Sequence, residues 1–337
     1  MRKKTVFVGL SGGVDSSVSA LLLKQKYKVV GVFIRTWSPS FIKCTWREER
    51  RDAMRVCAKL NIPFLECDAE EIYKKNVVDY MIQEYKEGKT PNPDVMCNRE
   101  VKFGVFWQFA KGRGADYIAT GHYARNKDGK LLKGRDKSKD QSYFLWKLTK
   151  EDLKHILFPI GGINKEKVRR IANKYKLFTS TKKDSQGICF LGPIDLKNFL
   201  SHYIKTKEGN VLNRKGRIIG KHSGSIFYTL GERHGFKVES KKPLYVVNKD
   251  VNKNIITVSS KQNMDNYKTN VCELKDINLI EDLEDKEYKA QIRYHGRLYN
   301  CRIDKSRIIF KKDVLVASGQ SIVFYDKDVC IGGGVVR

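Results

Sequence analysis

A glycine- and serine-rich segment near the start of the chain has residue types that bind anions. It reads Gly9-Leu10-Ser11-Gly12-Gly13-Val14-Asp15-Ser16-Ser17 and lies between a short apolar run and an amphipathic stretch. Two adjacent glycines allow a tight turn, and backbone amides at the start of a helix, together with serine hydroxyls, form a concave site for phosphate. The segment therefore predicts a phosphate-binding loop, although it lacks the lysine of a Walker A loop.

A second segment places a carboxylate close to a thiol. It reads Thr90-Pro91-Asn92-Pro93-Asp94-Val95-Met96-Cys97-Asn98. If a helix begins near Asp94, Cys97 falls in its first turn, where the helix dipole favours a thiolate. An acid beside a nucleophile can also transfer protons. A plainer interpretation, with Asp94 as a helix cap and Cys97 as part of the core, fits these residues equally well.

A third segment carries another thiol. It reads Lys182-Lys183-Asp184-Ser185-Gln186-Gly187-Ile188-Cys189-Phe190, so Cys189 follows a flexible glycine and lies near two positive charges. Nearby cations stabilise a thiolate. A cysteine between Ile and Phe is also typical of buried packing, so this segment alone predicts little.

The surrounding sequence alternates between strand-like and helix-like patterns. The expected elements are strands at 4–10, 28–35, 62–68 and 116–120, and helices at 14–27, 48–61, 69–87 and 98–111. This alternation predicts an α/β fold with a doubly wound parallel sheet, whose ligands bind beyond the carboxyl ends of the strands. The phosphate-binding loop follows the first strand and is expected at that edge.

The pattern changes at about residue 205. Before it, helices are expected at 166–175, with Asn164 as the N-cap, and at 194–202. After it, the chain is punctuated by glycine and strand-like, with a hairpin expected at 243–260 around Asn252-Lys253-Asn254. We therefore predict three domains: an α/β domain over 1–203, a small central domain over 204–262, and a β-barrel or sandwich over 263–337.

Length and charge limit the function classes. The 337 residues exclude a peptide hormone or a disulfide-stapled miniprotein, and an apolar fraction of 41% is that of a folded protein. The formal net charge is +28, from 66 Lys and Arg against 38 Asp and Glu. Such an excess attracts polyanions and favours phosphate contacts through counterion release, so nucleic acid is the first partner to expect. Basic enzymes that bind no nucleic acid also exist.

No run of about 18 apolar residues occurs, and the start of the chain lacks the pattern of a signal peptide, so we expect a cytoplasmic protein without a membrane segment. In a reducing compartment the eight cysteines would be thiols. No two of them are separated by two residues, and no His-Glu-x-x-His occurs, so the spacing predicts no zinc site. We assign to packing Cys44, Cys57, Cys67, Cys272, Cys301 and Cys330.

Taken in order, these motifs resemble a known family. Ser11-Gly12-Gly13-Val14-Asp15-Ser16-Ser17 is similar to the PP-loop of ATP pyrophosphatases, and with the Cys97 and Cys189 segments the chain resembles the tRNA-specific 2-thiouridylase (MnmA/TrmU) family over nearly its whole length. Ile34 stands where family members often have Met, and residues 38–47 replace a commonly acidic stretch. Other segments similar to the family are Thr120-Gly121-His122-Tyr123 and residues 139–144, 222–231, 319–320 and 330–334.

The resemblance implies a PP-loop (adenine nucleotide alpha hydrolase-like) domain, a small central tRNA-contacting domain and a C-terminal β-barrel. It implies ATP- and Mg²⁺-dependent transfer of sulfur to C2 of the wobble uridine in the tRNAs for Lys, Glu and Gln. The sulfur would be a persulfide on Cys189, supplied by a cysteine desulfurase or a sulfur-carrier protein. It would attack C2 directly, or Cys97 would release it and form a transient Cys97–Cys189 disulfide. An iron–sulfur cluster on these two cysteines is the less favoured alternative.

The resemblance also implies site residues. Cys97 would be the nucleophile, Cys189 the persulfide carrier and Asp94 the general acid and base. ATP would contact Gly9, Leu10, Ser11, Gly12, Gly13, Val14, Asp15, Ser16, Ile34 and Gly121. The tRNA would contact Asn92, Pro93, Asp94, His122, Lys139, Asp140, Gln141, Arg293, Tyr294 and Gln320. No residue is assigned as a protein ligand of a metal.

Two other function classes share part of the pattern. A different PP-loop ligase or amidotransferase, acting on a small molecule, would need neither Cys97 nor Cys189. A non-catalytic tRNA-binding protein would keep the basic charge without turning over ATP. The ordered set of three motifs favours the thiouridylase over both.

Overall fold

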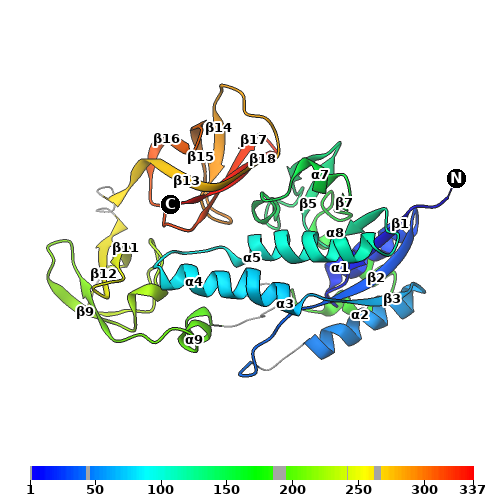
Figure 1. Cartoon of the computed structure of the whole chain (residues 1–337), viewed down its shortest axis with the longest axis horizontal. Coiled ribbons are helices and arrows are strands. Elements are labelled where there is room, and N and C mark those ends of the chain that lie inside the picture. Colours follow the sequence, from blue (N-terminus) through cyan, green and yellow to red (C-terminus); the bar gives the residue numbers. More distant parts are fainter. Residues whose placement is uncertain (1, 43–45, 185–194, 241, 262–266) are drawn as a thin grey trace.

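A computed structural model describes residues 2–42, 46–184, 195–240, 242–261 and 267–337. In this part of the chain three sheets form three lobes, with the N-terminal lobe at one end and the barrel above the central sheet at the other (Figure 1). None of the described helices is long and apolar enough to cross a membrane.

The N-terminal sheet is parallel, with strand order β3-β2-β1-β4-β7. Its strands are β1 (Thr5–Gly9), β2 (Lys28–Arg35), β3 (Phe64–Asp68), β4 (Tyr117–Ala119) and β7 (Ile156–Leu157). Side chains of β1 alternate between two cores, since Val6 and Val8 belong to one buried cluster and Phe7 to the other. Hydrophobic layers on both faces are what a doubly wound sheet requires, so the predicted fold class is confirmed.

Helices cover both faces of this sheet. On the face of Val6 and Val8 lie α1 (Val14–Lys24), α2 (Trp46–Leu60) and α8 (Lys165–Lys174). The opposite face carries α3 (Glu70–Tyr73), η1 (Lys74–Asp79), α4 (Tyr80–Lys86), α5 (Pro93–Met96), η2 (Cys97–Val105) and α6 (Phe106–Lys111). Among the expected boundaries, Asn164 is indeed the N-cap of α8, and its side chain accepts a hydrogen bond from the amide of Lys167.

Two of the expected helices differ from the sequence pattern. The segments expected as single helices contain π-helical stretches, η1 and η2. The second one also begins at Pro93 rather than at 98, because the Asn92 side chain accepts a hydrogen bond from the amide of Val95 and proline is well suited to the first helical position. The second π-helical stretch begins at Cys97 and runs for nine residues.

The central sheet has the strand order β10-β9-β8-β12-β11. The expected hairpin is confirmed, because β11 (Leu244–Asp250) and β12 (Ile255–Ser260) pair antiparallel around residues 251–254, with Asn254 at a φ of 52°. The other strands are β8 (Gly209–Leu212), β9 (Ile218–His222) and β10 (Lys237–Val238), and α9 (Leu196–Ser201) precedes them.

The C-terminal strands close into a barrel of six, since β13 pairs with both β16 and β18. These strands are β13 (Thr269–Leu279), β14 (Tyr288–Gln291), β15 (Leu298–Asp304), β16 (Arg307–Val314), β17 (Ser321–Asp326) and β18 (Val329–Val336). A hairpin of the N-terminal lobe, β5 (Ala124–Lys127) and β6 (Lys130–Lys133), joins β18 through Leu132 opposite Val329. The remaining short elements are η3 (Ser142–Phe144), α7 (Lys150–Leu153), η4 (Phe178–Thr181) and η5 (Ser225–Phe227).

A second contact fixes the barrel to the N-terminal lobe. The indole of Trp146 is fully buried against Gly333, where a Cβ would lie 2.8 Å from the indole Cδ2. The amide group of Asn278 donates hydrogen bonds to the carbonyls of Trp146 (2.7 Å) and Leu148 (2.9 Å). Glycine is therefore needed at 333 because the backbone of β18 lies directly on the indole.

We predict that Gly333→Ala lowers the free energy of unfolding by about 1–3 kcal/mol, because the added methyl group overpacks this contact. Urea unfolding measures the change. Gly162→Ala is the matched control, since a Cβ there would meet nothing within 4 Å. Equal effects of the two substitutions would contradict the proposed packing constraint.

Candidate functional site

The predicted phosphate-binding loop connects β1 to α1 at the point where the strand order reverses, between β1 and β4. Ser16 stabilises the loop, since its hydroxyl accepts from the amide of Ser11 at 3.3 Å and donates to the carbonyl of Gly13 at 3.1 Å. The N-cap residue of α1 is Gly13, which has no side chain to cap the helix. Its first amides can therefore bind an anion.

Close contacts surround three residues that the sequence analysis assigned to ATP binding. A Cβ on Gly12, which has a φ of 69°, would lie 2.7 Å from the carbonyl oxygen of Glu49. A Cβ on Gly121 would lie 2.8 Å from the amide nitrogen of Ser16. Ile34 lies against Gly9, where a Cβ would be 3.5 Å from its Cδ1. The structure thus brings Ile34 and Gly121 to the loop, and their contact with ATP stays a prediction.

The carboxylate of the loop is held by a lysine that the sequence analysis missed. Lys165 donates to both oxygens of Asp15, at 2.7 and 2.8 Å, and lies 2.9 Å from Asp184. Its side chain is only 12% exposed. The hydroxyl of Tyr123 donates to Asp15 at 2.8 Å. Nothing in the local pattern marks Lys165, because it follows a helix cap like any first-turn lysine.

This network continues into the predicted tRNA-contacting motif at 139–141. Lys139 forms an ion pair of 2.9 Å with Asp184, and Gln141 accepts a hydrogen bond of 3.0 Å from the amide of Tyr123. Partial burial acts to raise the pKa of Asp184, but hydrogen bonds from Lys165 and Lys139 outweigh it and lower that pKa to about 2. Asp15, Tyr123, residues 139–141, Asp184 and Lys165 therefore form one closed ring of polar contacts, which we call the Lys165 ring.

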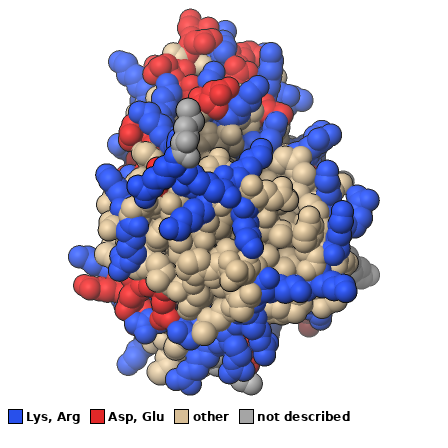
Figure 2. All heavy atoms as spheres, turned by 90° about the vertical axis from the view of Figure 1, so that its right-hand side faces the viewer, with Lys and Arg blue, Asp and Glu red and all other residues tan. Residues whose placement is uncertain are grey.

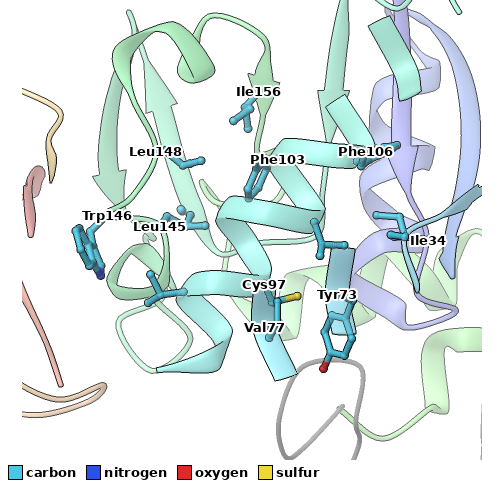
Figure 3. Packing of buried hydrophobic residues seen from close by; sticks show 14 of the residues in the cluster. Ile34, Tyr73, Val77, Cys97, Phe103, Phe106, Leu145, Trp146, Leu148 and Ile156 are labelled. Carbon is cyan, nitrogen blue, oxygen red and sulfur yellow. The ribbon is translucent and has the colours of Figure 1, made fainter. Parts of the chain in front are cut away.

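The predicted nucleophile Cys97 is fully buried. It shares a hydrophobic cluster with Tyr73, Val77 and Ile34 (Figure 3). Because the helix begins at Pro93, Cys97 lies just beyond the first turn and its amide already donates to the carbonyls of Pro93 and Asp94. Asn92, and not Asp94, is the helix cap. Cys189 lies outside the described residues.

Predicted tRNA-contacting residues from two domains meet beside this helix. Burial raises the pKa of Tyr143, whereas the charge of Arg293 and then the nearby side chain of Asn92 act to lower it. The ring of Tyr294, from the barrel, lies 4.4 Å from that of Phe144. Burial, followed by the charges of Asp140 and Asp94, raises the pKa of Tyr294 to about 12. Asn92, Asp94, Asp140 and Tyr294 are therefore neighbours, although the sequence separates them widely.

All three lobes fix the segment that leads to Asn92. The amide of Thr90 donates to the carbonyl of Ser318 in the barrel at 2.8 Å. Its hydroxyl lies 3.3 Å from that of Thr229 in the central lobe. A Cβ on Gly319 would lie 2.8 Å from the amide nitrogen of Thr90. The position of Asp94 and Cys97 thus depends on how the three lobes are assembled.

Three other predicted tRNA contacts are used within the protein. Arg293 donates to the carbonyl of Leu230 at 2.6 Å, and Gln320 accepts from the amide of Ala317 at 3.4 Å. His122 is buried, with its Nδ1 2.7 Å from the hydroxyl of Thr120. The roles of these residues toward tRNA remain predictions.

Five cysteines assigned to packing are buried, as expected: Cys57, Cys67, Cys272, Cys301 and Cys330. Burial raises the pKa of each thiol to about 11 or 12. Such thiols are poor nucleophiles at neutral pH. Cys44 lies outside the described residues.

Comparison with known proteins agrees with this arrangement. Three family models match, described as the tRNA methyl transferase HUP domain (residues 4–193), the tRNA methyl transferase PRC-barrel domain (197–260) and the Aminomethyltransferase beta-barrel domain (269–336). The tRNA-specific 2-thiouridylases MnmA of Bacillus licheniformis and Geobacillus thermodenitrificans are 42% and 43% identical, over 98% of this chain and 94% of each relative. The chain belongs to the MnmA family of tRNA-specific 2-thiouridylases. The resemblance predicted from the order of its motifs is thereby confirmed.

A solved structure of the U34-tRNA thiolase NcsA from Methanococcus maripaludis, with its [4Fe-4S] cluster, is also similar. It shares 18% identity, covers 59% of this chain and 62% of that chain, and has a TM-score of 0.37.

We predict that His122 makes this MnmA-family protein sensitive to acid. Its burial, and then the charge of Lys102, lower the pKa of His122 well below 6.5. Above pH 6.5 the imidazole of His122 is mostly neutral in the folded and in the unfolded protein. As the pH falls below 6.5, this histidine takes up a proton only in the unfolded chain. Between about pH 7 and pH 5 the folded state should therefore lose up to about 2 kcal/mol through this group.

Unfolding free energies at both pH values test this prediction. His122→Gln should lose less stability on acidification than the unchanged protein. The exposed His234→Gln controls for the substitution itself. If His122→Gln shows the same acid loss as the unchanged protein, this histidine is not the cause.

Proposed function

We propose that the protein uses ATP to adenylate the 2-oxygen of the wobble uridine in the tRNAs for Lys, Glu and Gln, and then replaces that oxygen with sulfur. The observation that carries the proposal is the placement of the loop and of the Asn92–Cys97 helix start around one core. Ile34 lies against Gly9 of the loop and belongs to the same buried cluster as Cys97. In a chain of this family, that placement supports adenylation and sulfur transfer at one site.

The loop has the properties that ATP requires. Gly12 and Gly121 leave no side chain where the backbone closes around the start of α1. The exposed Ser11 and the amides of the first turn would contact the phosphates. Asp15 is the carboxylate of the loop and would face the Mg²⁺ that accompanies ATP. ATP supplies pyrophosphate as a leaving group and AMP as the activating group on the uracil oxygen.

Sulfur transfer then needs two thiols. In one route the terminal sulfur of a Cys189 persulfide attacks C2 and AMP leaves; Cys97 then attacks the Cys189 sulfur, which breaks the S–S bond, leaves the transferred sulfur on C2 and forms a Cys97–Cys189 disulfide. In the other route Cys97 attacks the persulfide first, which forms the same disulfide and frees sulfide, and the sulfide then displaces AMP from C2. In both routes a thiol must later reduce the disulfide. The half-buried Asp94 would take and return the proton beside the extruded base. A cysteine desulfurase or sulfur-carrier protein would load Cys189. A cluster bound to the two cysteines remains the less favoured way to hold sulfide.

One prediction of the proposed function concerns the product of the reaction. Unmodified tRNA for Glu, incubated with the protein, ATP, Mg²⁺ and a cysteine-desulfurase sulfur source, should gain 2-thiouridine, measured by nucleoside mass spectrometry. Cys97→Ser and Cys189→Ser should each abolish it, because each removes a thiol of the relay. Cys272→Ser, at a thiol assigned to packing, should retain it.

Other outcomes would favour the rival functions. Pyrophosphate release without thiouridine, unchanged in Cys189→Ser, would indicate a PP-loop enzyme that acts on a small molecule. Binding of tRNA without any ATP turnover, unaffected by Asp15→Ala, would indicate a non-catalytic binding protein. Stoichiometric iron in the purified, active protein would favour the cluster over the persulfide.

Another prediction of the proposed function concerns the basic surface. Lys and Arg side chains are spread over much of the face in Figure 2, while acidic side chains gather mainly near its top. The affinity for tRNA should therefore fall as the salt concentration rises. The slope of log K against log salt should be steeper than about −3, because each phosphate contact contributes about 0.7–0.9 to its magnitude. Filter binding between about 50 and 200 mM salt measures it, and binding indifferent to salt in that range would refute it.

A further inference from the structure

A basic cavity lies between the β5–β6 hairpin of the N-terminal lobe and the barrel. Its volume is about 940 Å³. One wall contains Lys133, Arg135 and Lys137, and the other contains Lys289, His295 and Lys327. We call this cavity the hairpin–barrel cleft. None of these residues is among the site residues that the family resemblance implies.

The carboxylates that line the cleft are already engaged. Three of them are in ion pairs: Asp328 with Arg125 (3.0 Å), Asp326 with Lys286 (2.9 Å) and Glu287 with Lys311 (2.6 Å). The fourth, Asp140, accepts hydrogen bonds from the amides of Gly134 (2.9 Å) and Ser142 (3.1 Å). The ion pairs offset three of the four negative charges, so Asp140 is the one carboxylate left, among the described residues that line the cleft, to balance its remaining cations.

Five cations of the cleft have no ion-pair partner in the part of the chain that the structure describes: Lys133, Arg135, Lys137, Lys289 and Lys327. Four of them are exposed, while Lys133 is partly buried, with its Nζ 4.0 Å from the centre of the Tyr325 ring. Burial lowers the pKa of Lys133. An anion in the cleft would reduce the cost of keeping that charge away from water.

The cleft adjoins Tyr294 through two of its lining residues. Asp140 lines it and also acts on the pKa of Tyr294. His295 lines it as well, at a left-handed φ of 56°, and its ring lies 3.9 Å from that of Tyr294. An RNA strand that presents a base beside Asp94 and Tyr294 would thus lead its next phosphate into the cleft.

We propose that the hairpin–barrel cleft binds an unpaired ribonucleotide of the tRNA, next to the target uridine, through its phosphates. Sites of about 300–1,000 Å³ hold small ligands, so this cavity has room for a single nucleotide. The cations supply phosphate contacts, and His295 supplies a ring on which a base can stack. The proposal rests on tRNA being the substrate, as proposed above.

The test removes one cation from each wall, in the double variant Arg135→Gln, Lys289→Gln. The matched control is Arg302→Gln, Lys312→Gln, at exposed barrel residues that do not line the cleft. Dissociation constants for an unmodified tRNA transcript are measured over a salt series. The cleft variant should bind about tenfold more weakly, with a salt slope shallower by about 1.4, the value for two phosphate contacts on a single strand. The control should change neither.

Amine labelling of the unchanged protein gives a second measurement that needs no variant. Bound tRNA should protect Lys137 and Lys289 from labelling and leave Lys312 reactive. The proposal is overturned if the cleft variant binds tRNA with unchanged affinity and slope, or if Lys289 stays reactive in the complex.

These outcomes separate this proposal from the proposed function. Since tRNA binding needs no turnover, weakened binding by the cleft variant supports the cleft even if no thiouridine forms. Reduced thiouridine with unchanged tRNA affinity would overturn the cleft as an RNA site and point to a protein partner there. A protein that binds no tRNA would overturn both.

Discussion

The pairing of Lys165 with Asp15 and Asp184 is the interaction on which the site depends. One ammonium group, almost buried, neutralises two carboxylates that come from distant parts of the chain. Removing it would leave both carboxylates close together at the phosphate-binding loop. Asp15 would then lose the ammonium group that offsets its repulsion from Asp184, even though Lys139 and Arg169 still contact Asp184. Lys165 therefore holds the loop, α8 and residues 182–184 in one arrangement.

The rest of the Lys165 ring connects this pairing to the region expected to bind tRNA. Tyr123 forms hydrogen bonds with both Asp15 and Gln141, and Lys139 forms an ion pair with Asp184. The motif at 139–141 is therefore part of the support of the nucleotide loop as well as of the surface beside Tyr294. A shift of this motif on RNA binding would be transmitted to the loop through hydrogen bonds and ion pairs of ordinary length.

The barrel and the central lobe act on the chemistry by positioning. Thr90 contacts both of them just before Asn92, and Tyr294 reaches the same place from the barrel. The barrel in turn is fixed by Gly333 on Trp146 and by the pairing of β6 with β18. Neither lobe carries a residue proposed to react, yet the residues proposed to receive the base are brought together only when all three lobes are assembled.

The sequence by itself determined the local features: the phosphate-binding loop, the alternation of strands and helices, the cap at Asn164 and the hairpin at 243–260. Each of these features follows from the periodicity or the turn-forming residues of a short segment, so a few neighbouring residues are enough to predict it. Tertiary structure alone decided the role of Lys165, the burial of His122, the union of β6 with the barrel and the cleft between them. These depend on contacts between residues far apart in sequence, and no local pattern records which distant surface a lysine or a strand edge will meet.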